Sequence, residues 1–402
     1  MAATTAEKMR AWTGPALLSF GFRPFFLGAA VWAALAMALW VPILRGARIL
    51  PTALDPVSWH AHEFLFGYLG AAIAGFLLTA VPNWTGRLPV TGWWLGGLAA
   101  LWLAGRIAVA LSGWLPAPVV AALDLALPVA LMLVAAREIA AGRNWRNLIV
   151  LAALAAFTLG NAVFHWEAAQ GGFAAQGYGL RLGLAAGLML IALIGGRIVP
   201  SFTRNWLVRQ GPGRLPVPPM QRFDRLALAA LLAAMALWVA LPLHPATGTA
   251  LLLAGGLHLV RLGRWAGHRC TAEPLVLVLH GAYAFLPLGA LATGAEIAAP
   301  GMFGIGAAQH LWMAGAIGLM TLAVMTRATL GHTGQALHAG PGTVVIYLAL
   351  LVAVAARLGA GAWPAMAGPM TTAAGLGWIA AFGGYALLYG RLLLCRPPAQ
   401  DD

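Results

Sequence analysis

Histidines and acids placed in apolar stretches are the residues through which this sequence could do chemistry. The stretch "DPVSWHAHEFLFGYLGAAIAGFLLTAV", residues 55–81, opens with His60, His62 and Glu63 before it becomes apolar. Polar groups at membrane depth are costly and are functional candidates by default. Imidazoles bind haem iron and copper, and a neighbouring carboxylate can orient them or transfer protons. This stretch is therefore the first candidate site.

The histidines sort into layers when depth is estimated at about 1.5 Å per helical residue. His258 and His280 share a level about 9 Å from the inner boundary of their spans. His332 follows the tenth apolar run, and a helix would separate it from His310 by about 33 Å, so one metal cannot bind both. An outer layer contains His60, His62, His165 and His310. The remaining His244, His268 and His338 lie in loops or at span edges.

This sorting predicts two metal sites. His258 and His280, on consecutive helices, could ligate the iron of haem b from both faces. The outer layer could hold copper, or a second haem with copper beside it. Residues two apart on a helix point about 200° apart. His60 and His62 therefore share one metal only if the helix starts after His60, which Pro56 upstream favours; otherwise only one of them belongs to the site.

Acids and arginines lie at similar depths. Glu63 and Glu167 could orient the outer ligands or transfer protons to a bound substrate, and they are the catalytic candidates. Asp124 lies in the middle of an apolar run and needs a partner, for which Arg106 is suited. The candidates to bind haem, for instance through its propionates, are Arg106, Arg181, Arg197 and Arg327, although the topology of the chain explains Arg197 and Arg327 equally well.

The elements that must position these residues are membrane helices. The chain has 402 residues, 61% hydrophobic and 9% charged, whereas a soluble domain carries about a quarter charged residues. We predict an all-α polytopic transmembrane bundle of about twelve spans, forming a single integral membrane domain over residues 1–402. A polar connection, 200–224, separates six spans in 1–199 from six in 225–402. The expected spans are 22–44, 63–81, 93–112, 116–136, 147–167, 178–199, 225–243, 246–264, 274–295, 305–327, 342–360 and 371–394.

Charge predicts the orientation of the chain and excludes one class of function. The net charge of +13 comes almost entirely from arginines in short loops between apolar runs, which is the positive-inside pattern and not a nucleic-acid surface. Arginine-rich loops alternate with loops that have almost no basic residues. Both termini are therefore expected to be cytoplasmic, although Arg45 and Arg48 in the first outer loop weaken the pattern.

Several motifs together resemble the NnrS family over nearly the whole chain: "LLSFGFRPFFLGA", "WHAHEFLFGY", "GFLLTAVPNWTGR", "GRIVPSFTRNW" and "AVMTRATLGHTG". The resemblance implies a bacterial inner-membrane protein of about twelve spans that contains haem and copper and belongs to nitric oxide and denitrification biology. Gln335 stands where the family motif usually continues with arginine. The motif positions in this chain are His60, His62, Glu63, Asn83, Trp84, Arg197, Arg204, Arg327 and His332.

Three functions remain open at this point. The first is a haem–copper oxidoreductase that reduces nitric oxide, with electrons from quinol or another donor. The second is haem-based binding of nitric oxide, for sensing or protection, without turnover. The third is transport of a metal, haem or a nitrosyl-iron complex, which the scarcity of polar residues between the two histidine layers disfavours.

Overall fold

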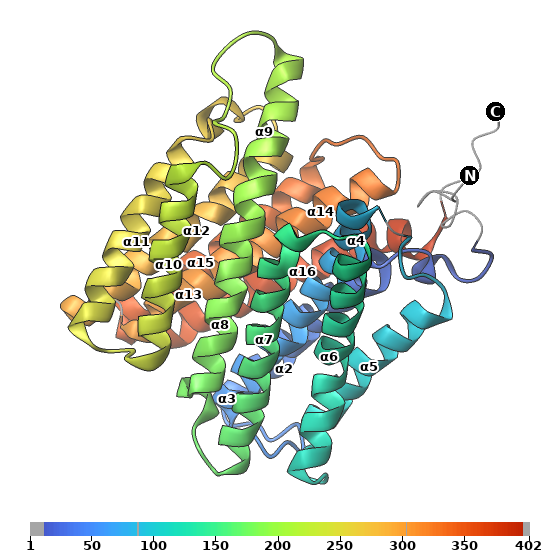
Figure 1. Cartoon of the computed structure of the whole chain (residues 1–402). Helices are drawn as coiled ribbons and strands as arrows, with labels where there is room; N and C mark the ends of the chain where they lie inside the picture. The colour runs from blue at the N-terminus through green and yellow to red at the C-terminus, as the bar shows by residue number, and fades with distance from the viewer. Residues whose placement is uncertain (1–11, 87, 303, 397–402) are drawn as a thin grey trace. The chain divides into compact units, whose positions relative to one another are not determined.

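The computed structural model describes residues 12–86, 88–302 and 304–396, and these residues form helices and loops with no strand among them. Twelve helices in this described part of the chain are long and apolar enough to cross a membrane, which confirms the predicted all-α multi-pass architecture (Figure 1). Three spans each consist of three consecutive elements: the second of α3 (Pro56–His62), η2 (Glu63–Leu69) and α4 (Gly70–Thr85), the sixth of α8 (Tyr178–Leu190), η5 (Ile191–Gly195) and α9 (Gly196–Gln210), and the tenth of α13 (Ile305–His310), η7 (Leu311–Leu319) and α14 (Met320–His332). The other spans of the first six are α2 (Phe22–Leu44), α5 (Trp93–Ala110), α6 (Ala117–Ala141) and α7 (Leu148–Ala169). Those of the last six are α10 (Arg222–Ala240), α11 (Pro245–Gly263), α12 (Pro274–Ala298), α15 (Pro341–Ala362) and α16 (Ala367–Leu394).

The second span begins earlier than expected. Pro56 is the first residue of α3, where its fixed φ suits a helix and its missing N–H would have no partner in any case. The Asp55 carboxylate caps this end by accepting hydrogen bonds from the backbone N–H groups of Val57 and Ser58, both at 3.0 Å. Proline therefore starts the helix instead of delaying it. The expectation that the chain is not yet helical at His60 is wrong.

The connection at 200–224 is also more helical than expected. Helix α9 continues to Gln210, and α10 begins at Arg222. A capping box at Gln221 and Asp224 fixes the start of α10, because each residue's side chain accepts from the other's backbone N–H. The part without helix is thus confined to residues 211–221.

Three spans contain a π-helical segment, namely η2, η5 and η7 in the second, sixth and tenth spans. In each segment a side chain donates to a backbone carbonyl: Trp102 to Gly67, Arg261 to Ala192, and Thr321 to Ile317. π-Helical turns are rare and are often found at functional sites. Here they recur at intervals of four spans.

The described chain divides into two compact units. The first contains the first five spans, continuing to Gly183, together with residues 328–336 and the end of α16 from Tyr385. The second contains residues 184–327 and 337–384. The division falls within α8, not in the connection at 200–224.

Arg23 joins the first span to the last within the first unit. Its Nη1 atom donates to the carbonyl oxygens of Leu392, Leu393 and Cys395, at 3.0, 3.0 and 3.1 Å. These carbonyls belong to the C-terminal end of α16, where backbone acceptors lack helical partners. The start of the first span and the end of the last span therefore lie on one side of the membrane; that this side is cytoplasmic stays a prediction.

Candidate metal centre

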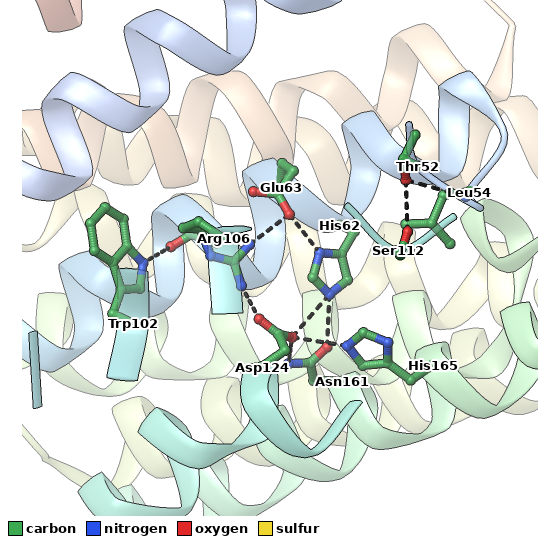
Figure 2. A network of polar contacts seen from close by, with 11 residues as sticks. Thr52, Leu54, His62, Glu63, Trp102, Arg106, Ser112, Asp124, Asn161 and His165 are labelled. Carbon is green, nitrogen blue, oxygen red and sulfur yellow. Dashed lines mark hydrogen bonds and ion pairs between the residues drawn. The ribbon is translucent and has the colours of Figure 1, made fainter. Parts of the chain in front are cut away.

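Polar side chains from five elements of the first unit form a buried cluster, shown in Figure 2. They lie near the start of the second span, where α3 meets η2, near the start of α6, and near the ends of α5 and α7. By helix rise, all are about 6–12 Å inside the same end of these spans. Each side chain is at least nine-tenths buried. This group, the Asp124 cluster, consists of His62, Glu63, Arg106, Asp124, Asn161 and His165.

Asp124 is the common partner of the cluster. Its Oδ2 atom lies 3.1 Å from His62 Nε2 and 3.0 Å from His165 Nε2, and it accepts from Asn161 Nδ2 at 2.7 Å. Its Oδ1 atom is paired with Arg106, so the predicted Asp124–Arg106 pair is confirmed. Arg106 also donates to Glu63 Oε1 at 2.6 Å, and it lies between the two carboxylates in Figure 2.

Gly67 in η2 allows this close approach. A β-carbon at position 67 would lie 2.5 Å from Arg106 Nη1 and 2.9 Å from Glu63 Oε2. Only a residue without a side chain fits against these two groups without displacing them. The backbone of the π-helical segment at Gly67 therefore packs directly against the buried Arg106–Glu63 ion pair.

His62 is surrounded by hydrogen-bond acceptors. Its Nδ1 atom faces Glu63 Oε1 at 3.0 Å, and its Nε2 atom faces Asp124 Oδ2. Nε2 also lies 3.1 Å from Asn161 Oδ1, because the Asn161 amide nitrogen donates to Asp124. A neutral imidazole has only one N–H. One nitrogen of a neutral His62 would therefore point its lone pair at oxygens.

The charge balance also indicates that the cluster is incomplete when both imidazoles are neutral. With both imidazoles neutral, Glu63, Asp124 and Arg106 leave the cluster with one negative charge in excess. A buried charge is costly unless it is paired. A proton on an imidazole or on a carboxylate, or a bound cation, would supply the missing positive charge.

The donor set fits a metal ion. One atom each of His62, Asp124 and His165 lie within 4.8 Å of one another, and all three side chains converge without rearrangement of the helices. Two imidazoles and a carboxylate suit copper, iron or zinc. Glu63 would hold the outer nitrogen of His62, as a carboxylate commonly does behind a metal-bound imidazole. The residues present therefore fit copper.

His60 points away from this cluster. Its ring stacks on Trp40, with centroids 4.4 Å apart and planes 16° apart, and it also contacts Phe64 at 4.5 Å. Because α3 is already helical at His60, the two histidines project about 200° apart. Of the two alternatives for His60 and His62, the early helix start leaves the second: only one of them, His62, belongs to this group.

Glu167 and the tenth-span histidine also have other neighbours than expected. The Glu167 carboxylate accepts from the backbone N–H groups of Tyr178 and Gly179, at 2.7 and 3.1 Å, and so caps α8. His310 belongs to the second unit, where its Nδ1 donates to the Gly306 carbonyl at 2.6 Å. Of the outer layer, the structure brings together His62 and His165.

The second unit contains another buried network, the Arg261 cluster, made of Asp224, His258, Arg261 and Tyr283. Arg261 donates to Asp224 Oδ1 at 2.8 Å and to Tyr283 Oη at 2.7 Å. His258 Nε2 lies 3.0 Å from the Ala227 carbonyl and must carry the proton, so Nδ1 accepts from Tyr283 at 2.8 Å. When His258 is neutral, each of these hydrogen bonds has one donor and one acceptor.

This arrangement does not fit the predicted haem. Both nitrogens of His258 are already hydrogen-bonded to protein groups. His280 Nε2 donates to Thr203 Oγ1 at 2.7 Å, because that hydroxyl itself donates to Val199. An iron between the two rings would have to break these contacts. That His258 and His280 ligate one haem b therefore stays a prediction, and it requires both rings to leave their present partners.

The remaining candidates lie among apolar or aromatic groups. The His332 ring contacts Phe20 and Phe22, each with centroids 5.4 Å away. The Arg327 guanidinium lies 4.1 Å from the centroid of Phe202, and that of Arg181 lies 4.7 Å from Tyr178. Arg197 lies in the first turn of α9. That Arg181, Arg197 or Arg327 binds a haem propionate stays a prediction, and the side chain of Asn83 lies outside the description.

Sequence reasoning missed Asn161, Tyr283 and Thr203. Asn161 precedes His165 by four residues and so lies on the same face of α7. A buried amide one turn from an intramembrane histidine was the available signal. Tyr283 and Thr203 gave no comparable signal, because each is a common residue near a span end or within an apolar run.

Outside the spans, the Cys270 thiol is disfavoured as a metal ligand or nucleophile. Cys270 is fully buried in the loop before α12, and this burial raises its pKa even though Thr203 and Arg269 oppose the effect. A thiol that stays protonated at neutral pH is a poor metal ligand. The Asp124 cluster therefore remains the strongest candidate site in the described chain.

Comparison with known proteins agrees with the motifs and the span count. A search among curated proteins finds no match. The family model described as NnrS protein matches residues 16–397, which include every span and both polar clusters. The chain is a member of the NnrS family.

Proposed function

We propose that this membrane protein binds nitric oxide at a copper ion held by His62, His165 and Asp124, and reduces it. Membership of the NnrS family connects the chain with nitric oxide. The observation that carries the proposal is the convergence of two imidazoles and a carboxylate on one point, in a cluster that lacks one positive charge. Copper bound there would supply a redox-active ion that nitric oxide can ligate.

The reaction sets clear requirements for the protein. Coupling two nitric oxide molecules to nitrous oxide and water consumes two electrons and two protons. We take the electron donor to be quinol or another reductant of the bacterial inner membrane, whose lipid bilayer surrounds the spans. The protein must hold its ligands rigidly, exclude water and deliver protons.

The chain's own residues have distinct parts in this scheme. Glu63 Oε1 accepts the Nδ1 proton of His62 and so directs the Nε2 lone pair toward Asp124. Arg106 neutralises part of the charge on both carboxylates. Glu63 Oε2 is buried and has no hydrogen-bond partner among the described residues, and we assign it as the atom that holds a proton for the reaction.

A second candidate is binding of nitric oxide without turnover, for sensing or protection. One observation favours it. In the part of the chain that the structure describes, His62, Asp124 and His165 are the one group of three metal-ligating side chains. His258 and His280 are hydrogen-bonded to protein groups, so among the described residues no second group of three metal ligands accompanies the first to pass electrons to copper.

Purified protein can test both candidates. Copper is counted by elemental analysis, nitric oxide binding is followed by optical and electron paramagnetic resonance spectra, and nitrous oxide is measured after addition of a reduced quinol analogue. We expect about one copper per chain and production of nitrous oxide. Protein without bound metal would overturn the proposal, and nitric oxide binding without nitrous oxide would establish the second candidate.

A further inference from the structure

A small cavity lies beside the Asp124 cluster within the first unit. Its volume is about 20 Å³, and its walls come from η2, α4, α5, α6 and α7. A cavity needs about 10–15 Å³ on this measure to admit one water-sized molecule. The space therefore holds one molecule of about two atoms, and it is far too small for haem or quinol.

Local features of three helices keep this space open. Gly70 in α4 lines the cavity, and even a β-carbon there would lie 3.9 Å from its nearest neighbour, Phe157. On α6, Pro128 has no N–H, so the carbonyl of Asp124, four residues earlier, lacks its helical hydrogen bond from that position. Phe66 adds a wall from the π-helical segment η2. Gly70, Pro128 and Phe66 of the π-helical segment all line this one cavity.

Most of the lining is aliphatic or aromatic, with side chains that include Phe66, Ile73, Leu127, Leu154 and Phe157. The polar part of the lining consists of Arg106, Asp124 and Asn161, whose carboxylate, guanidinium and amide groups already bond to one another. Arg106 Nε is buried and has no partner among the described residues, so one donor is left for a ligand atom.

The geometry points to a binding site for one small apolar gas molecule next to Asp124. A buried water needs about two to four polar partners, whereas this lining leaves one unpaired donor, Arg106 Nε, so the space favours an apolar guest over water. A diatomic gas dissolves in the bilayer and can form one weak hydrogen bond with Arg106. That the natural guest is nitric oxide rests on the proposed function; that the cavity accepts an apolar gas does not.

Xenon is a suitable probe because it is apolar, compact and visible by its anomalous scattering. Crystals of the detergent-purified full chain are pressurised with xenon, and copper is counted in the same preparation. We expect one xenon peak between Leu154, Phe157 and Asp124. A cavity that contains ordered water, or that stays empty under xenon, would overturn the inference.

Variants at the wall make the test specific. Leu154→Phe fills the space and should abolish the xenon peak, whereas Leu154→Ala enlarges it and should raise the occupancy. Gly70→Val is a second filling variant, since its methyl groups extend toward the cavity. Leu251→Ala makes the same truncation at a fully buried leucine of α11 and should leave the peak unchanged. A peak that survives both filling variants would contradict the assignment.

The two proposals fail in different ways. Xenon in the cavity of a protein without copper would leave the gas site in place and remove the metal centre. Copper at the Asp124 cluster without xenon in the cavity would leave the metal centre in place and remove the gas site. If both are present, nitric oxide should bind copper at least several-fold more slowly in Leu154→Phe, while the copper content stays the same.

Discussion

The Asp124 cluster of the first unit and the Arg261 cluster of the second each combine carboxylate, guanidinium and imidazole groups, but their hydrogen bonding differs. In the Arg261 cluster one carboxylate meets one guanidinium, and a tyrosine joins the guanidinium to a neutral imidazole. In the Asp124 cluster two carboxylates share one guanidinium, and His62 has acceptors on both sides.

This difference separates a structural network from a candidate site. Buried polar groups stabilise a fold only when each is paired, since an unpaired group costs about 1–3 kcal/mol and a charge more. In the Arg261 cluster the charges balance with ordinary protonation states, since one carboxylate meets one guanidinium. In the Asp124 cluster they balance only with one more positive charge, so we look for a ligand there and not in the second unit.

The largest expected effect is loss of the metal. We expect His62→Ala and His165→Ala each to reduce bound copper to background, because each removes one of the converging donors. Elemental analysis of protein purified in the presence of copper measures this directly. His258→Ala and His280→Ala are the matched controls and should retain the copper of the unaltered protein; if they lose it too, the contrast between the clusters is broken.

The next effect concerns stability. Arg261→Met removes the guanidinium and leaves Asp224 buried without its partner, which should cost about 3–5 kcal/mol. Thermal unfolding in detergent measures the change. The copper content of the folded fraction should not change, and a stable Arg261→Met protein would show that Asp224 does not depend on this pair.

A smaller change is expected from Glu63→Gln. The amide holds His62 less firmly, so copper affinity should fall about 10–100-fold, as for other groups behind a ligand. Competition with a copper chelator measures it. The same variant removes the excess negative charge, so the metal-free protein should unfold at no lower temperature than the unaltered chain. A clear loss of metal-free stability would contradict the charge argument.

The smallest effect is expected from Tyr283→Phe. Loss of the hydroxyl leaves His258 Nδ1 without its donor, while Arg261 keeps Asp224 and the Ala192 carbonyl. Destabilisation by about 1–2 kcal/mol should follow, visible as a lower unfolding temperature. If copper binding changed in this variant, the two clusters would be energetically coupled, which their separate hydrogen-bond networks do not indicate.

Sequence patterns predicted the spans well because hydropathy and length decide them. The helix bounds differ mainly where polar residues continue a helix beyond its apolar part, as at Pro56–His62 and at the end of α9. Depth counting also placed His62 and His165 near the outer ends of their spans, whereas Asp124, expected in the middle of its run, lies in the first half of α6. Depth is set by helix rise, which every helix shares.

The rotation of each helix about its axis could not be predicted in the same way. Spans that are apolar on all sides give little periodicity to show which face is inward. Equal depth therefore suggested that His258 and His280 meet at an iron, whereas the structure directs them to Tyr283 and Thr203. The same limit left His60 and His62 as alternatives until the helix start was known.

The π-helical segment η2 has a consequence for how the site can change in evolution. A π turn holds about one residue more than an α turn. Deleting one residue from η2 would let the second span close into a continuous α-helix and would turn the preceding part by about 100°. His62 would then leave Asp124, while α4 and the loops beyond it kept their places. Gain or loss of a single codon is thus enough to assemble or dismantle this centre. In the sixth and tenth spans, a one-residue deletion in η5 or η7 would rotate one part of the span against the other in the same way.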